Sequence, residues 1–115
     1  MDPLLACLHR SLEAHHGRDL RLFQDPSTEG LSAYQCLSSA GHARHARALA
    51  QAVKEALFQE LGLRPSVKEG LEEANWVLLD YGHVLVHILL PEARQHYALE
   101  ELWKGQELPW PSKGP

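Results

Sequence analysis

The chain is short of cysteine and of long apolar runs, and each shortage excludes a class of protein. Its two cysteines, Cys7 and Cys36, match no metal-binding or redox spacing, so we interpret them as reduced side chains packed inside a cytoplasmic protein. Neither a signal peptide nor a run of about 18 apolar residues occurs, which predicts a soluble protein without membrane contact.

The chain also lacks an excess of basic residues. Eleven Lys and Arg residues against fifteen Asp and Glu residues give a formal net charge of -4. A protein that coats the phosphates of a nucleic acid usually carries a clear basic excess, so this balance argues against that role. A local basic patch remains compatible with this net charge.

The length of 115 residues predicts one domain with a real hydrophobic core. A hydrophobic content of 44% and a charged content of 23% are ordinary values for a globular domain. Beyond Lys104 the chain is rich in Pro and Gly. We therefore place the domain at residues 1–104 and expect residues 105–115 to be a tail.

The stretch from Trp76 to Leu90 organises the expected fold. It contains two apolar runs separated by the segment Asp80–His83. The glycine in this segment favours a tight hairpin turn, and a two-residue loop of Tyr81 and Gly82 would place Leu79 opposite Val84. Both faces of such a hairpin are largely apolar, which predicts a position in the middle of a covered sheet.

Helical and strand periodicity predict the other elements. Asp2 is placed to cap a first helix, and Gly62 is placed to end the longest one. The expected helices cover residues 3–16 and 42–61 and a segment from residue 91, followed by a short turn at 99–103; the expected strands cover 19–24, 34–38 and 65–68, with a loop at 25–30. This order predicts a single small α/β (α+β) domain with a mixed β-sheet flanked by helices.

Eight histidines raise the question of a metal site. His83 and His87 are four residues apart, and on a strand this separation is roughly 13 Å, which is too far to share one ion. His42 and His45 can share one helix face, but they lack a third ligand nearby. We therefore predict no metal and no cofactor, and we interpret the histidines as surface and helix-end residues.

No pattern of catalytic residues is present. Ser38 and Ser39 are expected near a helix start. Two interpretations stay open: the pair binds an anion through backbone N–H groups, or Ser39 caps the helix. Asp80 either caps backbone donors in the hairpin turn or holds a charge for a partner. Paired carboxylates for acid–base chemistry and a nucleophile motif are both missing, so we predict that the protein is not an enzyme.

Four aromatic residues fall between the hairpin and the end of the last helical segment. They are Trp76, Tyr81, Tyr97 and Trp103. Two interpretations stay open, because Trp and Tyr are common in cores and are also favoured anchors of protein interfaces. Tyr81 is expected at the tip of a turn, where full burial is difficult.

Most of the chain resembles a known family. The matching segments are Asn75–Gly82, Val84–Ile88, Pro91–Arg94 with Tyr97, Leu99–Trp103 and, upstream, Leu37–Ser39 and Arg44–Ala50. Together they closely resemble the ribosomal silencing factor family RsfS, also called Iojap or YbeB, over about residues 4–103. Two positions depart from the family pattern, since Ala33 stands where an acid is usual and Ala40 where a glycine is usual.

The resemblance implies a fold related to the nucleotidyltransferases without their catalytic residues. It also implies a function. Members of the family bind the ribosomal protein numbered fourteen on the large subunit, block joining of the small subunit and repress translation when nutrients are limiting. Off the ribosome they are often homodimers.

The resemblance places the ribosomal contact around the hairpin and the last helix. The expected partner-binding residues are Trp76, Leu79, Asp80, Tyr81, Tyr97 and Trp103. Arg44 and Arg47 are candidates for a peripheral contact with ribosomal RNA. Two alternatives stay open: a large-subunit assembly factor that uses the same surface, and a residual nucleotidyltransferase that would hold a nucleotide or a metal between Ser39 and Asp80.

Overall fold

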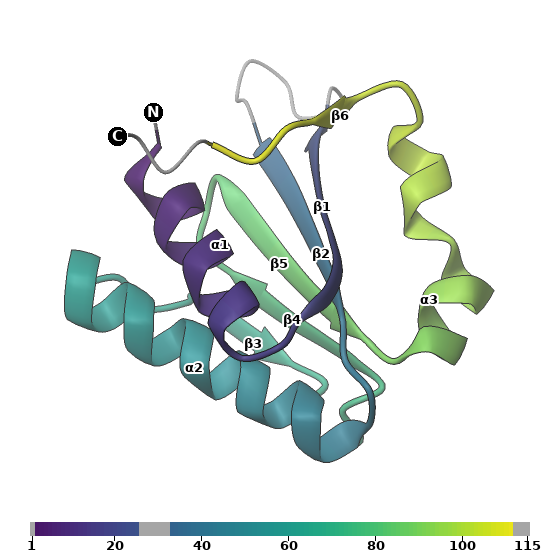
Figure 1. Ribbon diagram of the computed structural model, residues 1–115, viewed down its shortest axis with the longest axis horizontal. Coiled ribbons are helices and arrows are strands. Elements are labelled where there is room, and N and C mark those ends of the chain that lie inside the picture. Colours follow the sequence, from purple (N-terminus) through teal and green to yellow (C-terminus); the bar gives the residue numbers. More distant parts are fainter. Residues whose placement is uncertain (1, 26–32, 112–115) are drawn as a thin grey trace.

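A six-stranded mixed sheet forms the centre of the protein, of which the computed structural model describes residues 2–25 and 33–111 (Figure 1). The strands are β1 (Arg18–Asp25), β2 (Ala33–Ser39), β3 (Val67–Glu69), β4 (Trp76–Asp80), β5 (Val84–Leu89) and β6 (Glu107–Leu108). They lie in the order β3-β4-β5-β2-β1-β6. Strands β2 and β5 pair in parallel, and the other neighbours pair antiparallel, so the predicted mixed sheet is confirmed.

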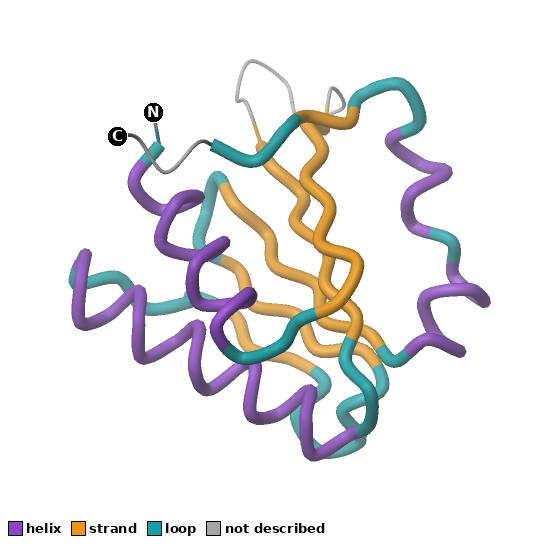
Figure 2. The backbone as a smooth tube through the Cα atoms, viewed as in Figure 1, coloured by secondary structure: helices purple, strands orange, loops and turns teal. Residues whose placement is uncertain are grey.

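Helices cover the two faces of this sheet unequally. The long helices α1 (Pro3–Ala14) and α2 (Ala43–Leu61) pack side by side against one face. The short helix α3 (Pro91–Tyr97) and the 3-10 turn η1 (Leu99–Trp103) lie against part of the other face (Figure 2). No helix within the described ranges is long and apolar enough to cross a membrane.

The hairpin β4–β5 supplies the centre of the core, as its apolar pattern predicts. Val77, Leu79, Val84, Val86 and Ile88 point toward α1 and α2 and have no exposed surface. Burying one such side chain stabilises the fold by roughly 1.5–3 kcal/mol, so this row is a main source of stability.

The register of the hairpin differs from the expected one. Gly82 and His83 form the two-residue loop, the N–H of Tyr81 donates to the carbonyl of Val84 at 2.9 Å, and Leu79 lies opposite Val86. Gly82 has a φ of 89°, a left-handed conformation that suits the first position of such a loop. Each residue changes its partner by two positions, so the two predicted faces keep their members.

The start of α2 also differs from the expectation. His42 is the N-cap residue, and its Nδ1 accepts the backbone N–H of His45 at 3.2 Å. Ser39, the predicted cap, ends β2 instead, and its hydroxyl accepts a hydrogen bond from Arg94 at 2.8 Å. The cap therefore lies three residues later than expected, and Ser39 bonds to α3 on the other face of the sheet instead.

Several local predictions are confirmed. The carboxylate of Asp2 accepts the N–H of Leu4 at 2.9 Å, and Gly62 ends α2 with a φ of 69°. Both cysteines are buried and free, and burial raises the pKa of Cys7 to about 11. The expected loop at 25–30 lies outside the described residues except for its first, which ends β1.

The segment after Lys104, expected to be a tail, contacts β1 and α1 through its described residues. Strand β6 pairs with β1 at the edge of the sheet. Beyond it, the ring of Trp110 stacks on His9 with 4.7 Å between the ring centroids, and its N–H donates to the carbonyl of Leu20 at 3.3 Å. The proline and glycine content of this segment does not predict the two-residue strand β6, which forms by pairing with β1, far away in the sequence.

Candidate functional site

The second face of the sheet is covered at one end and open at the other. Trp76, Leu78 and Asp80 of β4 alternate with core residues and point away from α1 and α2, beside Leu85 of β5. All four are partly exposed, because α3 and η1 cover only the part of this face formed by β1, β2 and the end of β5. We call these four residues the open sheet face.

Acidic side chains lie at the edge of the open sheet face, one belonging to it and one on the neighbouring strand β3. Glu69 of β3 lies opposite Leu78 and is exposed, and Asp80 ends β4 opposite Leu85. One carboxylate oxygen of Asp80 accepts the N–H of Gly82 at 2.8 Å, which confirms the turn-capping interpretation. The face therefore combines an apolar centre with a negatively charged rim.

A cluster of aromatic rings joins the open sheet face to α3 and η1. Trp76 packs against Tyr97 with 4.7 Å between the ring centroids, and Tyr97 is 51% exposed. Trp103 packs against Phe23 at 5.7 Å and against His87 at 6.0 Å and is 8% exposed. Of the predicted partner-binding residues in this cluster, Trp76 and Tyr97 reach the surface, while Trp103 is buried beneath the cluster.

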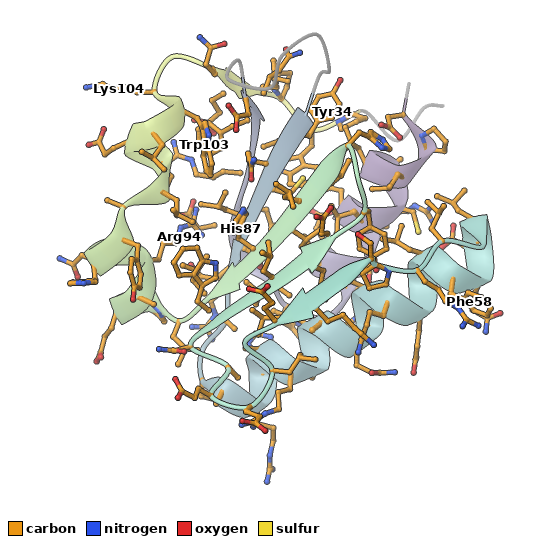
Figure 3. All side chains as sticks on the ribbon, turned by 180° about the vertical axis from the view of Figure 1, so that it is seen from behind. Tyr34, Phe58, His87, Arg94, Trp103 and Lys104 are labelled. Atoms are coloured by element: carbon orange, nitrogen blue, oxygen red, sulfur yellow. The ribbon has the colours of Figure 1, made fainter. Side chains whose placement is uncertain are left out.

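Beneath this cluster lies a buried polar chain centred on His87 (Figure 3). The indole N–H of Trp76 donates to Nδ1 of His87 at 3.1 Å. The Nε2 atom of His87 lies 2.8 Å from Oε1 of Gln35, whose amide nitrogen donates to Asp25 at 3.3 Å. Because an indole only donates, Nδ1 of His87 must accept, and the proton of the neutral ring is on Nε2.

The environment keeps His87 neutral. Burial disfavours the charged imidazolium and lowers the pKa of His87 from 6.5 to about 4. The interpretation of the histidines as surface and helix-end residues is therefore wrong for His87, which is 7% exposed. Protonation would remove the acceptor that holds the indole of Trp76.

A buried arginine fastens α3 and η1 to the sheet. Arg94 is 7% exposed, and it donates to the Ser39 hydroxyl at 2.8 Å and to the Glu100 carboxylate at 3.2 Å. Its remaining nitrogen, Nη2, forms an ion pair with Asp19 at 3.2 Å without hydrogen-bond alignment. Arg94 thus ties together β1, β2, α3 and η1, the framework of the aromatic cluster.

Two predicted partner-binding residues lie on the other face of the sheet. Leu79 has no exposed surface and packs in the core under α1 and α2. The ring of Tyr81 packs against the same core, and burial raises its pKa to about 12. Its buried hydroxyl has no hydrogen-bond partner among the residues that the structure describes. The structure therefore separates Leu79 and Tyr81 from Trp76, Asp80 and Tyr97.

The residues considered for nucleotide chemistry are not brought together. Along β5, Ser39 pairs at Leu89 and Asp80 pairs at Leu85, so four strand residues, or at least about 13 Å, separate them. His45 accepts the Gly41 N–H at 3.0 Å, which gives it a capping role. Within residues 2–25 and 33–111, no three His, Cys, Asp or Glu side chains are placed to hold a metal ion.

The two arginines considered for RNA contact differ in their surroundings. Arg47 donates from its guanidinium to the carbonyl oxygens of Leu71 and Glu72 at 2.9 and 2.6 Å, so it orders the loop before β4. Arg44 is exposed near the start of α2. Only Arg44 therefore keeps its guanidinium available to a partner.

Sequence reasoning missed Gln35 and Arg94. Gln35 is a polar residue inside an otherwise apolar strand and pairs with the hairpin at Leu85, so its position on β2 was a usable signal. Arg94 is one polar residue among several on a short helix, and nothing in its local sequence marks it as buried. Its role depends on how α3 folds back onto β2.

Sequence comparisons with known proteins agree with this architecture. The family model described as "Ribosomal silencing factor during starvation" matches residues 2–113. A protein named ribosomal silencing factor RsfS from Chromobacterium violaceum is 34% identical over 97 residues, which cover 84% of this chain and 79% of that protein. The mouse protein named mitochondrial assembly of ribosomal large subunit protein 1 is 32% identical over 95 residues, 80% of this chain and 41% of its own length.

Solved structures give the same result. A crystal structure of a Chromobacterium violaceum protein superposes with a TM-score of 0.82 at 30% identity and covers 97% of this chain and 94% of its own. A second structure, from Bacillus halodurans, gives a TM-score of 0.77 at 25% identity over 92% of this chain and 96% of its own. From the family match, the relatives and the shared fold, the chain belongs to the ribosomal silencing factor family.

Proposed function

We propose that the protein binds the large ribosomal subunit in the cytoplasm through the open sheet face and prevents the small subunit from joining. In this proposal it acts as a non-enzymatic silencing factor that represses translation under nutrient limitation. The ribosomal protein numbered fourteen is the proposed partner on the large subunit. Membership of the silencing factor family supports the general role.

The observation that carries the proposal is the incomplete cover of the sheet. Leu78 and Leu85 are diagonal neighbours on one face of the β4–β5 pair, in positions that α3 and η1 do not cover. A partly exposed apolar surface with a polar rim is the usual composition of a protein interface. The rim residues Glu69 and Asp80 are acidic, so the surface fits a partner with a basic rim.

We infer different roles for the predicted contact residues. Trp76 and Tyr97 would act as aromatic anchors, since both lie at the surface and pack against each other. Asp80 would supply charge. Trp103, Leu79 and Tyr81 would act indirectly, by holding the sheet and the α3–η1 segment in place.

Sedimentation of purified ribosomal subunits tests the proposal. Large and small subunits are mixed with and without the protein and separated on a gradient. Co-migration with large subunits together with a loss of whole ribosomes is the expected result. Absence from the large-subunit fraction would overturn the ribosomal assignment.

A matched pair of variants tests the surface itself. Leu78→Lys places a positive charge at the centre of the open sheet face, opposite Glu69, where it is tolerated by the fold but repels a basic partner. Ala48→Lys adds the same charge at an exposed position of α2, on the other side of the sheet. Leu78→Lys should abolish co-migration and Ala48→Lys should preserve it; equal behaviour would exclude the open sheet face.

A second function uses the same contact. The mouse relative is named for assembly of the ribosomal large subunit. If this protein were an assembly factor, it would co-migrate with large subunits without reducing the yield of whole ribosomes. The same gradient therefore separates silencing from assembly.

Two accompanying features belong to the proposal. We infer that the free protein is a homodimer, which analytical ultracentrifugation over a range of concentrations tests. We also infer a peripheral contact of exposed Arg44 with ribosomal RNA. Arg44→Glu should then weaken large-subunit binding most at low salt, because phosphate contacts are salt-dependent.

A further inference from the structure

An aromatic ring is exposed at the far end of α2, away from the open sheet face. Phe58 is 43% exposed and points outward from the helix, on the opposite side of the molecule from Trp103 (Figure 3). The guanidinium of Arg64 lies over the ring of Phe58, with 4.5 Å between its carbon and the ring centroid. Both residues present planar groups to solvent.

Basic side chains gather around this ring. A hollow of about 310 Å³ is lined by Phe58 and by Lys54, Arg64 and Lys68, which come from α2, the following turn and β3. Its acidic residue, Glu55, accepts a hydrogen bond from Gln51 at 2.8 Å. In a chain with a net charge of -4, this hollow carries three cations against one acid.

In contrast to Arg10 and Arg21, these three cations have no carboxylate partner in the described part of the chain. Arg10 pairs with Glu60 at 2.8 Å, and Arg21 pairs with Glu107 at 2.9 Å. Lys54, Arg64 and Lys68 form no ion pair within 4.0 Å among the residues that the structure describes. Their charges therefore remain available to an anionic ligand.

We propose that Phe58, Lys54, Arg64 and Lys68 form a binding site for single-stranded RNA. Cations beside an exposed aromatic ring are the combination that binds single strands, because the phosphates meet the charges and a base stacks on the ring. The guanidinium of Arg64 offers a second stacking plane. A base inside a duplex is already stacked on its neighbours, so a paired strand cannot use this site in the same way.

This site is separate from the surfaces named in the proposed function. Phe58 is fourteen residues from Arg44 along α2, which corresponds to roughly 21 Å. The open sheet face lies on the other side of the sheet from α2. RNA binding at this site can therefore be tested separately from large-subunit binding through the open sheet face, and one can fail without the other.

Fluorescence anisotropy with a labelled oligouridine measures this interaction on the intact protein. Three phosphate contacts on a single strand predict that log Kd rises with log salt concentration with a slope of about 2. Lys68→Glu should weaken binding and reduce the slope by about 0.7. Lys104→Glu changes the net charge equally at an exposed site far from the hollow and should have little effect (Figure 3).

A second pair of variants tests stacking. Phe58→Ala should weaken binding about tenfold, because stacking on an aromatic ring contributes strongly to single-strand affinity. Leu102→Ala removes an even more exposed apolar side chain, 71% exposed, and should leave affinity unchanged. All four substituted side chains are exposed, and equal melting temperatures would show that their variants are folded.

Three results would overturn the proposal. Anisotropy that stays flat up to about 1 mM protein, beyond the range of non-specific binding, would exclude an RNA site. Equal losses for Lys68→Glu and Lys104→Glu, or none for Phe58→Ala, would exclude this location or the stacking contact. Displacement of the RNA by polyglutamate as efficiently as by unlabelled RNA would assign the site to an acidic protein segment instead.

Discussion

Trp76 donates its indole N–H to Nδ1 of His87 at 3.1 Å, and this bond joins the surface of the open sheet face to a buried polar chain. The ring of Trp76 is held from above by Tyr97 and from below by His87. Its orientation therefore depends on a neutral histidine that can accept at Nδ1. A partner that contacts Trp76 would meet a pre-positioned ring, which lowers the entropy lost on binding.

The lowered pKa of His87 predicts a loss of stability in acid. The unfolded chain takes up a proton near its ordinary pKa of about 6.5, whereas the folded protein resists until about pH 4. Stability is therefore unaffected above about pH 6.5 and falls between pH 6.5 and 4, by up to about 3 kcal/mol. Urea unfolding at a series of pH values measures this fall.

The substitution His87→Gln isolates this contribution. Glutamine keeps one acceptor and one donor but does not titrate, so the variant should lose stability less steeply between pH 6.5 and 4 than the wild type. An unchanged slope would show that another group, not His87, controls the acid response. The indole N–H resonance of Trp76 should also move in His87→Gln, because its acceptor has changed.

The central hairpin and the longest helix were predictable because their patterns are strong and local. Alternation along β4 assigns Leu79 to the core and Trp76 to the opposite face, and helical periodicity assigns Leu49 and Val53 to the buried side of α2. The same alternation places Leu79 away from Trp76. The expected contact set mixed two faces that the period of two already separates.

Other features depend on single bonds or on distant contacts and were not predictable in this way. The hairpin loop is fixed at Gly82 and His83, where the Asp80 carboxylate bonds the Gly82 N–H, and a neighbouring pair of loop residues satisfies the same apolar pattern. Burial of His87 depends on η1, which brings Trp103 over the sheet. The sequence periodicity of β5 does not indicate that His87 is covered in this way.

Removal of the buried arginine should loosen α3 and η1. Arg94→Met deletes the hydrogen bonds to Ser39 and Glu100 and should lower the free energy of unfolding by about 1–3 kcal/mol. Hydrogen exchange should accelerate first at the amides of α3. Arg94→Lys keeps the charge but not the planar fork, so its loss should be intermediate; unchanged exchange in Arg94→Met would show that the aromatic cluster alone holds the segment.

Two substitutions should separate stability from binding. Leu79→Ala removes a fully buried side chain and should cost about 2–5 kcal/mol of stability, with normal large-subunit binding in the fraction that remains folded. Tyr97→Ala removes a half-exposed anchor and should cost only about 0.5–1.5 kcal/mol, while binding weakens about tenfold. Urea unfolding and gradient co-migration measure the two effects; normal binding by Tyr97→Ala would remove Tyr97 from the proposed contact.

The last described segment should contribute to stability even though its composition resembles a tail. Trp110→Ala deletes the stacking on His9 and the hydrogen bond to Leu20, which together predict a loss of about 1–2 kcal/mol in urea unfolding. Trp110→Phe keeps a ring for stacking and loses only the N–H, so it should recover part of this loss. An unchanged unfolding midpoint in Trp110→Ala would show that the contacts of Trp110 do not stabilise the domain.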